Sequence, residues 1–363
     1  MTLAVAAARR DAEPLRVVML ATGLTGYLDA KFRALVERGV ELFVITQAKR
    51  DNVAYERFPL EDVAKVHAWH EMPTGEELNR LVDGFAPHAI LVHSWHIPPY
   101  REVLKGREGQ ALRVCWMDNN WLGTPRQWVG RATSRWFLQP MFDAAMVPCE
   151  RTETFARHLG FGPDTILRGS LCADTDLYGA GPWPGSELAS RRAFLAALRM
   201  VHHKGADVLA DAYRRYRDAV PEPWDLHLAG VGPLLSDFDG VPGVVRHGFV
   251  QPRELAGLFH ASSAYVNPSL AEPYGVVLHE ATAAGLPVIT SDMVGAAPTM
   301  VQDGVNGYLY PTGDAAALAD RMARVSTSSA ARLEEMSAVS KGLSLRLSPS
   351  SWARNLEEFL RTC

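Results

Sequence analysis

The sequence contains little cysteine, and its four cysteines are far apart. They are Cys115, Cys149, Cys172 and Cys363, and no two of them form a C-x-x-C pair. This spacing excludes a dense disulfide scaffold and a paired-cysteine metal site. We therefore expect reduced thiols in a cytoplasmic protein.

Long apolar runs and an excess of positive charge are also missing. No run approaches the ~18 apolar residues that span a bilayer. The first arginines follow the short apolar run at the N-terminus, which is the wrong order for a secretory signal. The formal net charge is −4, so the composition gives no reason to expect a nucleic-acid partner. We expect a soluble, cytoplasmic chain, and contact with the inner face of a membrane is left open.

Several familiar catalytic motifs are absent as well. There is no Walker loop, no G-x-S-x-G elbow and no G-x-G-x-x-G dinucleotide fingerprint. What is present is a chain of 363 residues with 47% apolar and 21% charged residues, ordinary for a globular protein. This length allows two domains with sizeable cores.

The most informative stretch is the one around Glu272. An apolar run at 264–266 predicts a buried strand, and a polar loop at 267–275 follows it. A helical pattern then runs to Gly285, where a left-handed cap is sterically free, and 286–290 predicts the next strand. A helix N-terminus at the end of a parallel strand binds anions, so we expect an anionic ligand near Glu272.

Strand and helix patterns alternate along the rest of the chain. A glycine loop, which includes Gly23 and Gly26, follows the first predicted strand at 15–21. Thr74 and Glu77 predict a capping box at the start of a helix over 74–84. Strands are predicted at 15–21, 40–46, 89–92, 113–117, 144–147, 165–167, 192–198, 226–229, 244–246 and 264–266, and helices at 205–216 and 252–259.

This alternation predicts an α/β protein of two doubly wound, Rossmann-like domains facing a cleft. The N-terminal domain covers 1–176, and the tail within 350–363 predicts an amphipathic helix. The C-terminal domain covers 186–345. The Gly/Pro-rich segment GAGPWPGSE at 179–187 reads as the linker between the domains.

Charged residues near the predicted strand ends are the candidates for chemistry. Arg199 and Lys204 lie between a strand and a helix, where two cations would neutralise a diphosphate. His202 and His203 lie between them, but no further ligand is found at metal spacing, so we expect solvated side chains. His93 follows the strand at 89–92; a lone histidine is more often a core or rim residue, but its position at a strand end favours contact with a ligand.

Two carboxylates in the central stretch allow different interpretations. Glu272 lies in a Pro/Gly loop and is difficult to explain structurally, which favours contact with a ligand. Glu280 is either part of the same site or a partly buried helix residue with a structural hydrogen bond. A glycosidase acid/base pair would also use two carboxylates, but nothing else in the sequence fits one.

The segment 126–142 interleaves three arginines with tryptophan and phenylalanine. A basic-aromatic helix can lie on an anionic membrane, line an acceptor groove, or pack on its own domain. Packing is the default expectation. A peripheral membrane contact through 126–142 is the alternative.

At this point the sequence resembles the retaining glycosyltransferases of family 4, which have the GT-B fold. The stretch PSLAEPYGVVLHEATAAGLPVITS resembles the family's E-x7-E signature, with Glu272 and Glu280 at its acidic positions. The stretch LRMVHHKGADVLADAY resembles the family's phosphate-clamp segment, with Arg199 and Lys204 at its cationic positions. LHLAGVGPL, RHGFV and VNGYLYPTGD follow in the family's order.

The resemblance implies transfer of a sugar from a nucleotide-diphosphate sugar, UDP rather than GDP, with retained anomeric configuration and no metal or cofactor. The acceptor would be a hydroxyl of a glycan, a lipid-linked substrate or a small molecule. A nucleotide-sugar epimerase and a non-catalytic nucleotide-sugar-binding protein remain alternatives.

The resemblance also implies that the C-terminal helix within 350–363 crosses back to the N-terminal domain and joins it. It further implies roles for individual residues. The catalytic set would be Arg199, Lys204, Glu272 and His93. Donor-binding residues would be Gly23, Gly26, Gly248, Phe249, Val250, Tyr274, Gly275, Val276, Val277 and Glu280, and the N-terminal acceptor candidates are Asp118, Asn119, Trp121 and Arg126.

Overall fold

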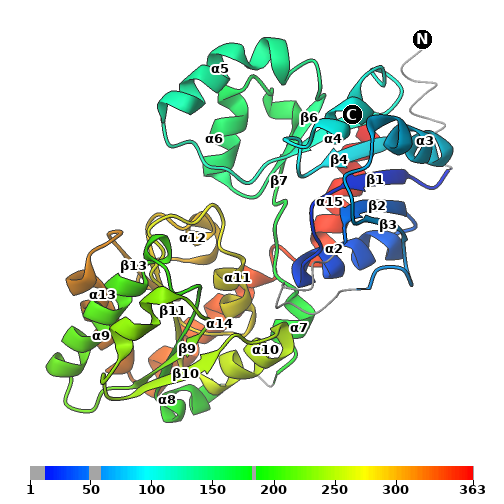
Figure 1. Ribbon diagram of the computed structural model, residues 1–363. Coiled ribbons are helices and arrows are strands. Elements are labelled where there is room, and N and C mark those ends of the chain that lie inside the picture. The colour runs from blue at the N-terminus through cyan, green and yellow to red at the C-terminus, as the bar shows by residue number, and fades with distance from the viewer. Residues whose placement is uncertain (1–12, 49–58, 182–184, 363) are drawn as a thin grey trace. The chain divides into compact units, whose positions relative to one another are not determined.

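The computed structural model describes residues 13–48, 59–181 and 185–362. The chain divides into two compact units (Figure 1). Unit 1 comprises Met1–Leu171 and Pro349–Cys363, and unit 2 comprises Cys172–Ser348. The chain thus passes between the units twice, at 171/172 and at 348/349.

The described residues of unit 1 form a seven-stranded parallel sheet in the order β3-β2-β1-β4-β5-β6-β7. The strands are β1 Arg16–Leu20, β2 Glu41–Gln47, β3 Lys65–Trp69, β4 Ala89–Val92, β5 Leu112–Trp116, β6 Ala144–Val147 and β7 Ile166–Arg168. The helices are α2 Gly26–Glu37, α3 Gly75–Phe85, α4 Pro98–Leu104, α5 Pro125–Phe137, α6 Glu150–His158 and α15 Pro349–Thr362.

Unit 2 contains a six-stranded parallel sheet in the order β10-β9-β8-β11-β12-β13. The strands are β8 Ala193–Ala197, β9 Asp225–Ala229, β10 Val244–Gly248, β11 Ala264–Asn267, β12 Val288–Ser291 and β13 Gly307–Tyr310. The helices are α7 Thr175–Gly179, α8 Leu188–Arg191, α9 Ala206–Ala219, α10 Pro252–Ala261, α11 Val276–Ala283, α12 Ala297–Met300, α13 Ala315–Ser326 and α14 Ala330–Ser344.

The central strands of both sheets are short apolar runs buried on both faces. Strands β4, β6, β11 and β12 are buried throughout. Helices on both faces of a parallel sheet remove its strands from water, so the strands appear in the sequence as continuous apolar runs. The predicted pair of doubly wound α/β units is confirmed.

The C-terminal helix α15 belongs to unit 1, where Figure 1 shows it in red beside α2. The indole of Trp352 is buried, with its ring centroid 6.4 Å from that of Phe32. Arg38, the C-cap of α2, forms an ion pair with Glu357 at 2.6 Å. An apolar helix face and a charged contact at its edge hold the tail on this unit.

Local predictions at helix ends agree with the structure. Thr74 and Glu77 form the reciprocal capping box at the start of α3. Gly285 has a φ of +77° after α11, in the left-handed region that glycine adopts without strain.

Two sequence expectations differ from the structure. The sheet-edge strands β3 and β13 were not predicted, because both are only partly buried and β3 has no continuous apolar run. The Gly/Pro-rich segment at 179–187 lies within unit 2, apart from its residues 182–184, which fall outside the described part. Tyr178, next to this segment, packs edge-on against Phe259 at a centroid distance of 5.7 Å, and Lys341 donates to the Gly179 carbonyl. The chain changes unit earlier, at 171/172.

Candidate active site

The central feature of unit 2 is a pair of loops that follow the neighbouring strands β8 and β11. We call residues 198–205 the basic loop and residues 267–275 the acidic loop. The His203 carbonyl accepts hydrogen bonds from the backbone N–H groups of Leu270 and Ala271, at 3.1 and 3.2 Å. The backbone therefore holds the two loops together at the carboxyl edge of the sheet.

Lys204 and Glu272 form an ion pair across these loops. Only 19% of the lysine side chain and 17% of the glutamate side chain are exposed. A charge pair shielded from water interacts more strongly than one on the surface. The predicted clamp lysine and the predicted sugar-binding glutamate are thus in direct contact.

Glycines allow the close approach of these loops. Gly205 has a φ of +71°, and a Cβ built there would lie 2.0 Å from the Pro268 carbonyl oxygen. Gly295 supports the acidic loop from the other side by donating its N–H to the Glu272 carbonyl at 3.1 Å. Any larger residue at Gly205 would push the loops apart.

Arg199 lies in the basic loop and is exposed. Its guanidinium lies 3.2 Å from the His203 ring nitrogen. It remains accessible to an anionic ligand, and a guanidinium binds phosphate oxygens in a bidentate manner.

Helix α11 begins directly after the acidic loop, at Val276. Gly275 is its N-cap with a φ of +90°, and no side chain caps this helix end. The Tyr274 carbonyl already accepts a hydrogen bond from Ala296 at 2.7 Å. Val276 and Val277 occupy the first turn, where backbone N–H groups and the helix dipole favour an anion.

Glu280 lies one turn further along α11 and is buried, with 8% exposure. Burial raises the pKa of its carboxyl to about 8, while a hydrogen bond from Tyr178 acts in the opposite direction. At neutral pH the carboxyl is therefore mostly protonated, and it can both donate and accept a hydrogen bond.

The RHGFV stretch lies on the edge strand β10 of unit 2. Gly248 ends this strand with a φ of +69°, and its carbonyl accepts from Gly230 at 2.6 Å. Phe249 is 37% exposed and Val250 is half-buried. These residues follow β10, two strands away from the basic loop that follows β8.

In unit 1, the predicted residues follow the adjacent strands β1, β4 and β5. The Thr22 and Ser94 hydroxyl oxygens are 3.2 Å apart, and His93 donates its backbone N–H to the Leu20 carbonyl. The glycine loop with Gly23 and Gly26 therefore lies beside His93. The His93 imidazole packs edge-on against Trp116 at a centroid distance of 5.5 Å.

The fold of the chain is shared by solved glycosyltransferases. A glycosyltransferase from Rickettsia africae superimposes with a TM-score of 0.75 at 12% identity, covering 96% of this chain and 98% of that one. The HepE protein of Anabaena in complex with UDP and glucose gives 0.73 at 16% identity, covering 96% of this chain and all of the other.

Sequence comparison agrees. The D-inositol 3-phosphate glycosyltransferase of Saccharomonospora viridis is 25% identical, covering 94% of this chain and 88% of its own. Residues 191–328, which include both loops, match the family model described as Glycosyl transferases group 1. The chain is a glycosyltransferase of the GT-B fold. Over 33% of each chain, the glycosyltransferase is 35% identical to the phosphatidyl-myo-inositol mannosyltransferase of Mycobacterium leprae.

The residues predicted to bind the acceptor differ in their contacts within unit 1. Asp118 and Asn119 follow β5, and Asn119 is exposed. The Trp121 ring instead packs against Trp128, Phe155 and His158, with centroids 5.2, 5.7 and 4.2 Å away. Trp121 thus has a clear packing role in unit 1.

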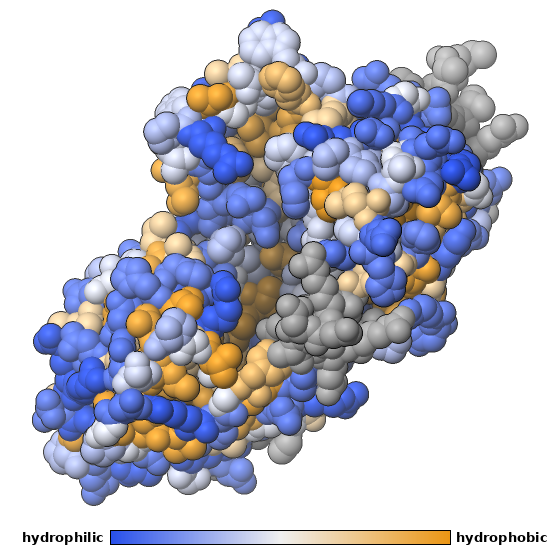
Figure 2. Space-filling view, in the orientation of Figure 1, coloured by the Kyte–Doolittle hydropathy of each residue, from blue (hydrophilic) through white to orange (hydrophobic). Residues whose placement is uncertain are grey.

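Helix α5 corrects the expectation that residues 126–142 pack on their own domain. Ser134 is the buried residue of this helix, which ends at Phe137. Trp128, Trp136 and Phe137 are 52%, 60% and 69% exposed. The helix therefore turns small and polar residues inward and its aromatic residues outward. Figure 2 shows pale and orange residues over this part of the surface.

The histidines of the basic loop, His202 and His203, are both exposed, as predicted. His202 is exposed but hydrogen-bonded, because the Asp207 carboxylate lies 2.8 Å from its ring nitrogen. Asp207 lies beyond the short helix at His202–Lys204, so the folded loop brings together two groups that the sequence spacing did not connect. Throughout the described ranges, no group of three His, Cys, Asp or Glu residues is arranged to hold a metal ion.

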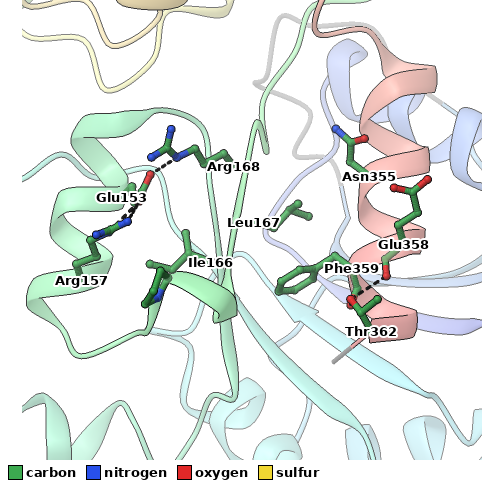
Figure 3. Close-up of a pocket in the computed structure, with 10 residues that line it drawn as sticks. Glu153, Arg157, Ile166, Leu167, Arg168, Asn355, Glu358, Phe359 and Thr362 are labelled. Atoms are coloured by element: carbon green, nitrogen blue, oxygen red, sulfur yellow. Dashed lines mark hydrogen bonds and ion pairs between the residues drawn. The ribbon is translucent and has the colours of Figure 1, made fainter. Parts of the chain in front are cut away.

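A pocket of about 700 Å³ lies in unit 1 between α6, β7 and α15 (Figure 3). Glu153 lines it and binds both Arg157 and Arg168. Glu358 and Phe359 of α15 face these groups across the pocket. Both arginines are already paired with Glu153, so we assign no anionic ligand to this pocket.

The sequence did not identify two residues that contact and support the site. Tyr178 binds Glu280 from α7, and the His203 carbonyl joins the two loops. Neither residue has a motif or spacing that connects it with its partner. Both contacts arise from packing between elements that are distant in the sequence.

Proposed function

We propose that this glycosyltransferase transfers a sugar from a UDP-sugar to a hydroxyl acceptor, with retention of anomeric configuration and without a metal. The observation that carries the proposal is the Lys204–Glu272 pair next to the uncapped start of α11 and the exposed Arg199. Two cations and a helix N-terminus supply positive potential for a diphosphate, and Glu272 supplies a carboxylate for sugar hydroxyls.

In this mechanism the diphosphate binds between the basic loop and the start of α11. Arg199 and Lys204 stabilise the negative charge that grows on the leaving diphosphate. Glu272 exchanges its contact with Lys204 for sugar hydroxyls, and Glu280 holds the ribose. His93 contributes a contact to the sugar from the N-terminal unit. The leaving diphosphate helps to deprotonate the acceptor on the same face of the sugar.

The preference for UDP and the acceptor class are supported by related proteins. HepE, which has the same fold, is solved with UDP and glucose. The related sequences are named for inositol phosphate and phosphatidyl-inositol acceptors. A polar or lipid-linked polyol is therefore the acceptor class to test first, alongside glycans and small molecules.

The donor is tested by thermal unfolding with a panel of UDP- and GDP-sugars, with and without EDTA. A ligand at about 100 times its Kd stabilises the folded state by about 2.7 kcal/mol, so the correct donor raises Tm measurably. We expect the largest shift from a UDP-sugar, unchanged by EDTA. NMR of the product then reports the anomeric configuration. A shift that requires a divalent metal, or an inverted product, would contradict the mechanism.

We also propose that α5 binds an anionic membrane surface. Arg126, Arg131 and Arg135 lie among its exposed aromatic side chains, and the sequence has no acidic residue between Asp118 and Asp143. Arg131 lies over the Trp128 ring and Arg135 over the Trp136 ring, at 5.1 and 4.5 Å. Within the described part of the chain, no helix is long and apolar enough to cross a bilayer. Contact would therefore be peripheral.

Flotation with vesicles tests this contact. Changing Arg126, Arg131 and Arg135 to glutamine should weaken binding to anionic vesicles on the order of 100-fold, because each arginine near such a surface contributes about 1 kcal/mol. Exposed arginines of unit 2, Arg214, Arg215 and Arg324, provide the matched triple control. Equal binding by the two triple variants, or no binding by the wild type at low salt, would contradict the proposal.

A further inference from the structure

Lys31 of α2 is a fully buried lysine, with 0% exposure. Burying an ammonium group is costly unless it gains compensating contacts. Its Nζ donates to the Ser170 carbonyl at 2.8 Å. The same nitrogen lies 4.4 Å from the Trp116 ring centroid and 5.0 Å from that of Trp352. The Ser170 carbonyl and the cation–π contacts, which include the Tyr27 ring at 5.1 Å, help to hold this charge inside unit 1.

The Trp116 ring also contacts His93. The imidazole meets the indole nearly at right angles, with an interplanar angle of 87° and a centroid distance of 5.5 Å. Lys31 and His93 thus share one rigid, buried aromatic neighbour. Moving the lysine would change both the support of the indole and the electrostatic field at the imidazole.

Several charged groups act on His93 from the elements around it. Burial lowers the pKa of the imidazole, Asp118 after β5 raises it, and Lys31 and His96 lower it. The carboxylate of Asp118 thus favours a charged imidazole, and Lys31 opposes this effect. A neutral imidazole has one donor and one acceptor for a sugar hydroxyl, whereas an imidazolium can only donate.

We propose that Lys31 is a positioning residue for His93: through Trp116 it fixes the orientation of the imidazole, and its positive charge disfavours the charged form of the ring. The role in the reaction rests on the proposed function, in which His93 contacts the donor sugar. The arrangement of the three side chains does not depend on that function.

The test compares Lys31→Met, which keeps length and removes charge, with Lys31→Arg, which keeps charge. His93 is titrated by NMR in the full chain, with His93→Gln to assign its signal, and kcat/KM is measured from pH 5.5 to 8. In Lys31→Met we expect the His93 midpoint to move upward. The ratio of kcat/KM at pH 5.5 to kcat/KM at pH 8 should be about three- to tenfold lower in Lys31→Met than in the wild type. Lys31→Arg should keep the wild-type profile.

A purely structural lysine would give a different result. Lys31→Met would then change Tm but leave the His93 midpoint and the pH profile unmoved, which would overturn the inference. If Lys31→Met does not fold, Lys31→Gln replaces it, because its amide can still donate to a backbone carbonyl. A wild type that turns over no nucleotide sugar would contradict the proposed function alone, since the NMR titration still decides whether Lys31 controls His93.

Discussion

Replacing Lys204 with methionine should lower kcat by about 30- to 1000-fold, corresponding to a loss of ~2–4 kcal/mol of transition-state stabilisation. The charge lost is the one that would face the leaving diphosphate. Lys204 is also largely shielded from water, so solvent cannot replace its charge fully. Steady-state kinetics with the donor identified by thermal shift provide the measurement.

Further variants define what Lys204 does. Lys341→Met is the matched control, because Lys341 is a partly buried lysine of the same unit whose Nζ donates to the Gly179 carbonyl. The double variant Lys204→Met/Glu272→Gln removes both charges of the ion pair. If Lys204 serves only to neutralise Glu272, the double variant is as active as Glu272→Gln alone. A charge clamp predicts that its activity stays below that of Glu272→Gln.

Glu280 should make the unfolding free energy of the protein depend on pH. The folded-state pKa is raised to about 8 by burial, above the ordinary value of 4.5. Between these two pH values, the folded state therefore keeps a proton on Glu280 that the unfolded state has lost. Stability from this group is fully present below about pH 4.5 and is lost as pH rises through 8. The steepest loss is about 1.4 kcal/mol per pH unit, and the total is on the order of several kcal/mol.

Glu280→Gln tests this dependence, because glutamine keeps the shape of a protonated carboxyl and does not titrate. The difference in Tm between Glu280→Gln and the wild type should grow in favour of the variant as pH rises from 5 to 8.5. Glu222→Gln, which alters an exposed carboxylate of the same unit, serves as the control. A Tm difference that is constant across this range would show that Glu280 is charged in the folded state.

Much of the fold was predictable because parallel strands buried on both faces leave a direct trace in the sequence. The apolar runs at 89–92 and 144–147 coincide with β4 and β6. A half-exposed edge strand such as β3 leaves no such trace. Composition was misleading at 179–187, since Gly and Pro also occur in segments that pack against their own unit.

The site was predictable in its residues but not in its pairings. Glu272 and Lys204 each stood out, yet their contact spans 68 positions and exists because β8 and β11 are adjacent. Burial raises the pKa of Glu280, and Tyr178 of α7 contacts it. The spacing of residues in the sequence does not predict this environment. Helix α5 illustrates a further limit: its pattern indicates two faces, but only the fold decides which one points inward.

Like Lys31 in unit 1, His279 of α11 in unit 2 is a buried polar side chain. Each of them contacts residues next to both segments of the chain that connect the units. The Nδ1 of His279 accepts from the Ala173 N–H at 3.1 Å, and its Nε2 lies 3.0 Å from the Ser344 carbonyl. Burial lowers the pKa of its imidazole to about 4, so the ring is neutral at neutral pH. Lys31 in turn contacts Ser170 and Trp352.

Each of the two connecting segments, or tethers, is therefore held at one end by Lys31 and at the other end by His279. Between Ser170 and Ala173 the tether consists of residues 171 and 172 only, and Leu171 and Cys172 are both buried. Between Ser344 and Trp352 it consists of residues 345–351. Because Leu171 and Cys172 are buried whereas Leu345 is 59% exposed, an added residue would disturb packing at 171–172 and would be tolerated better at 345–351.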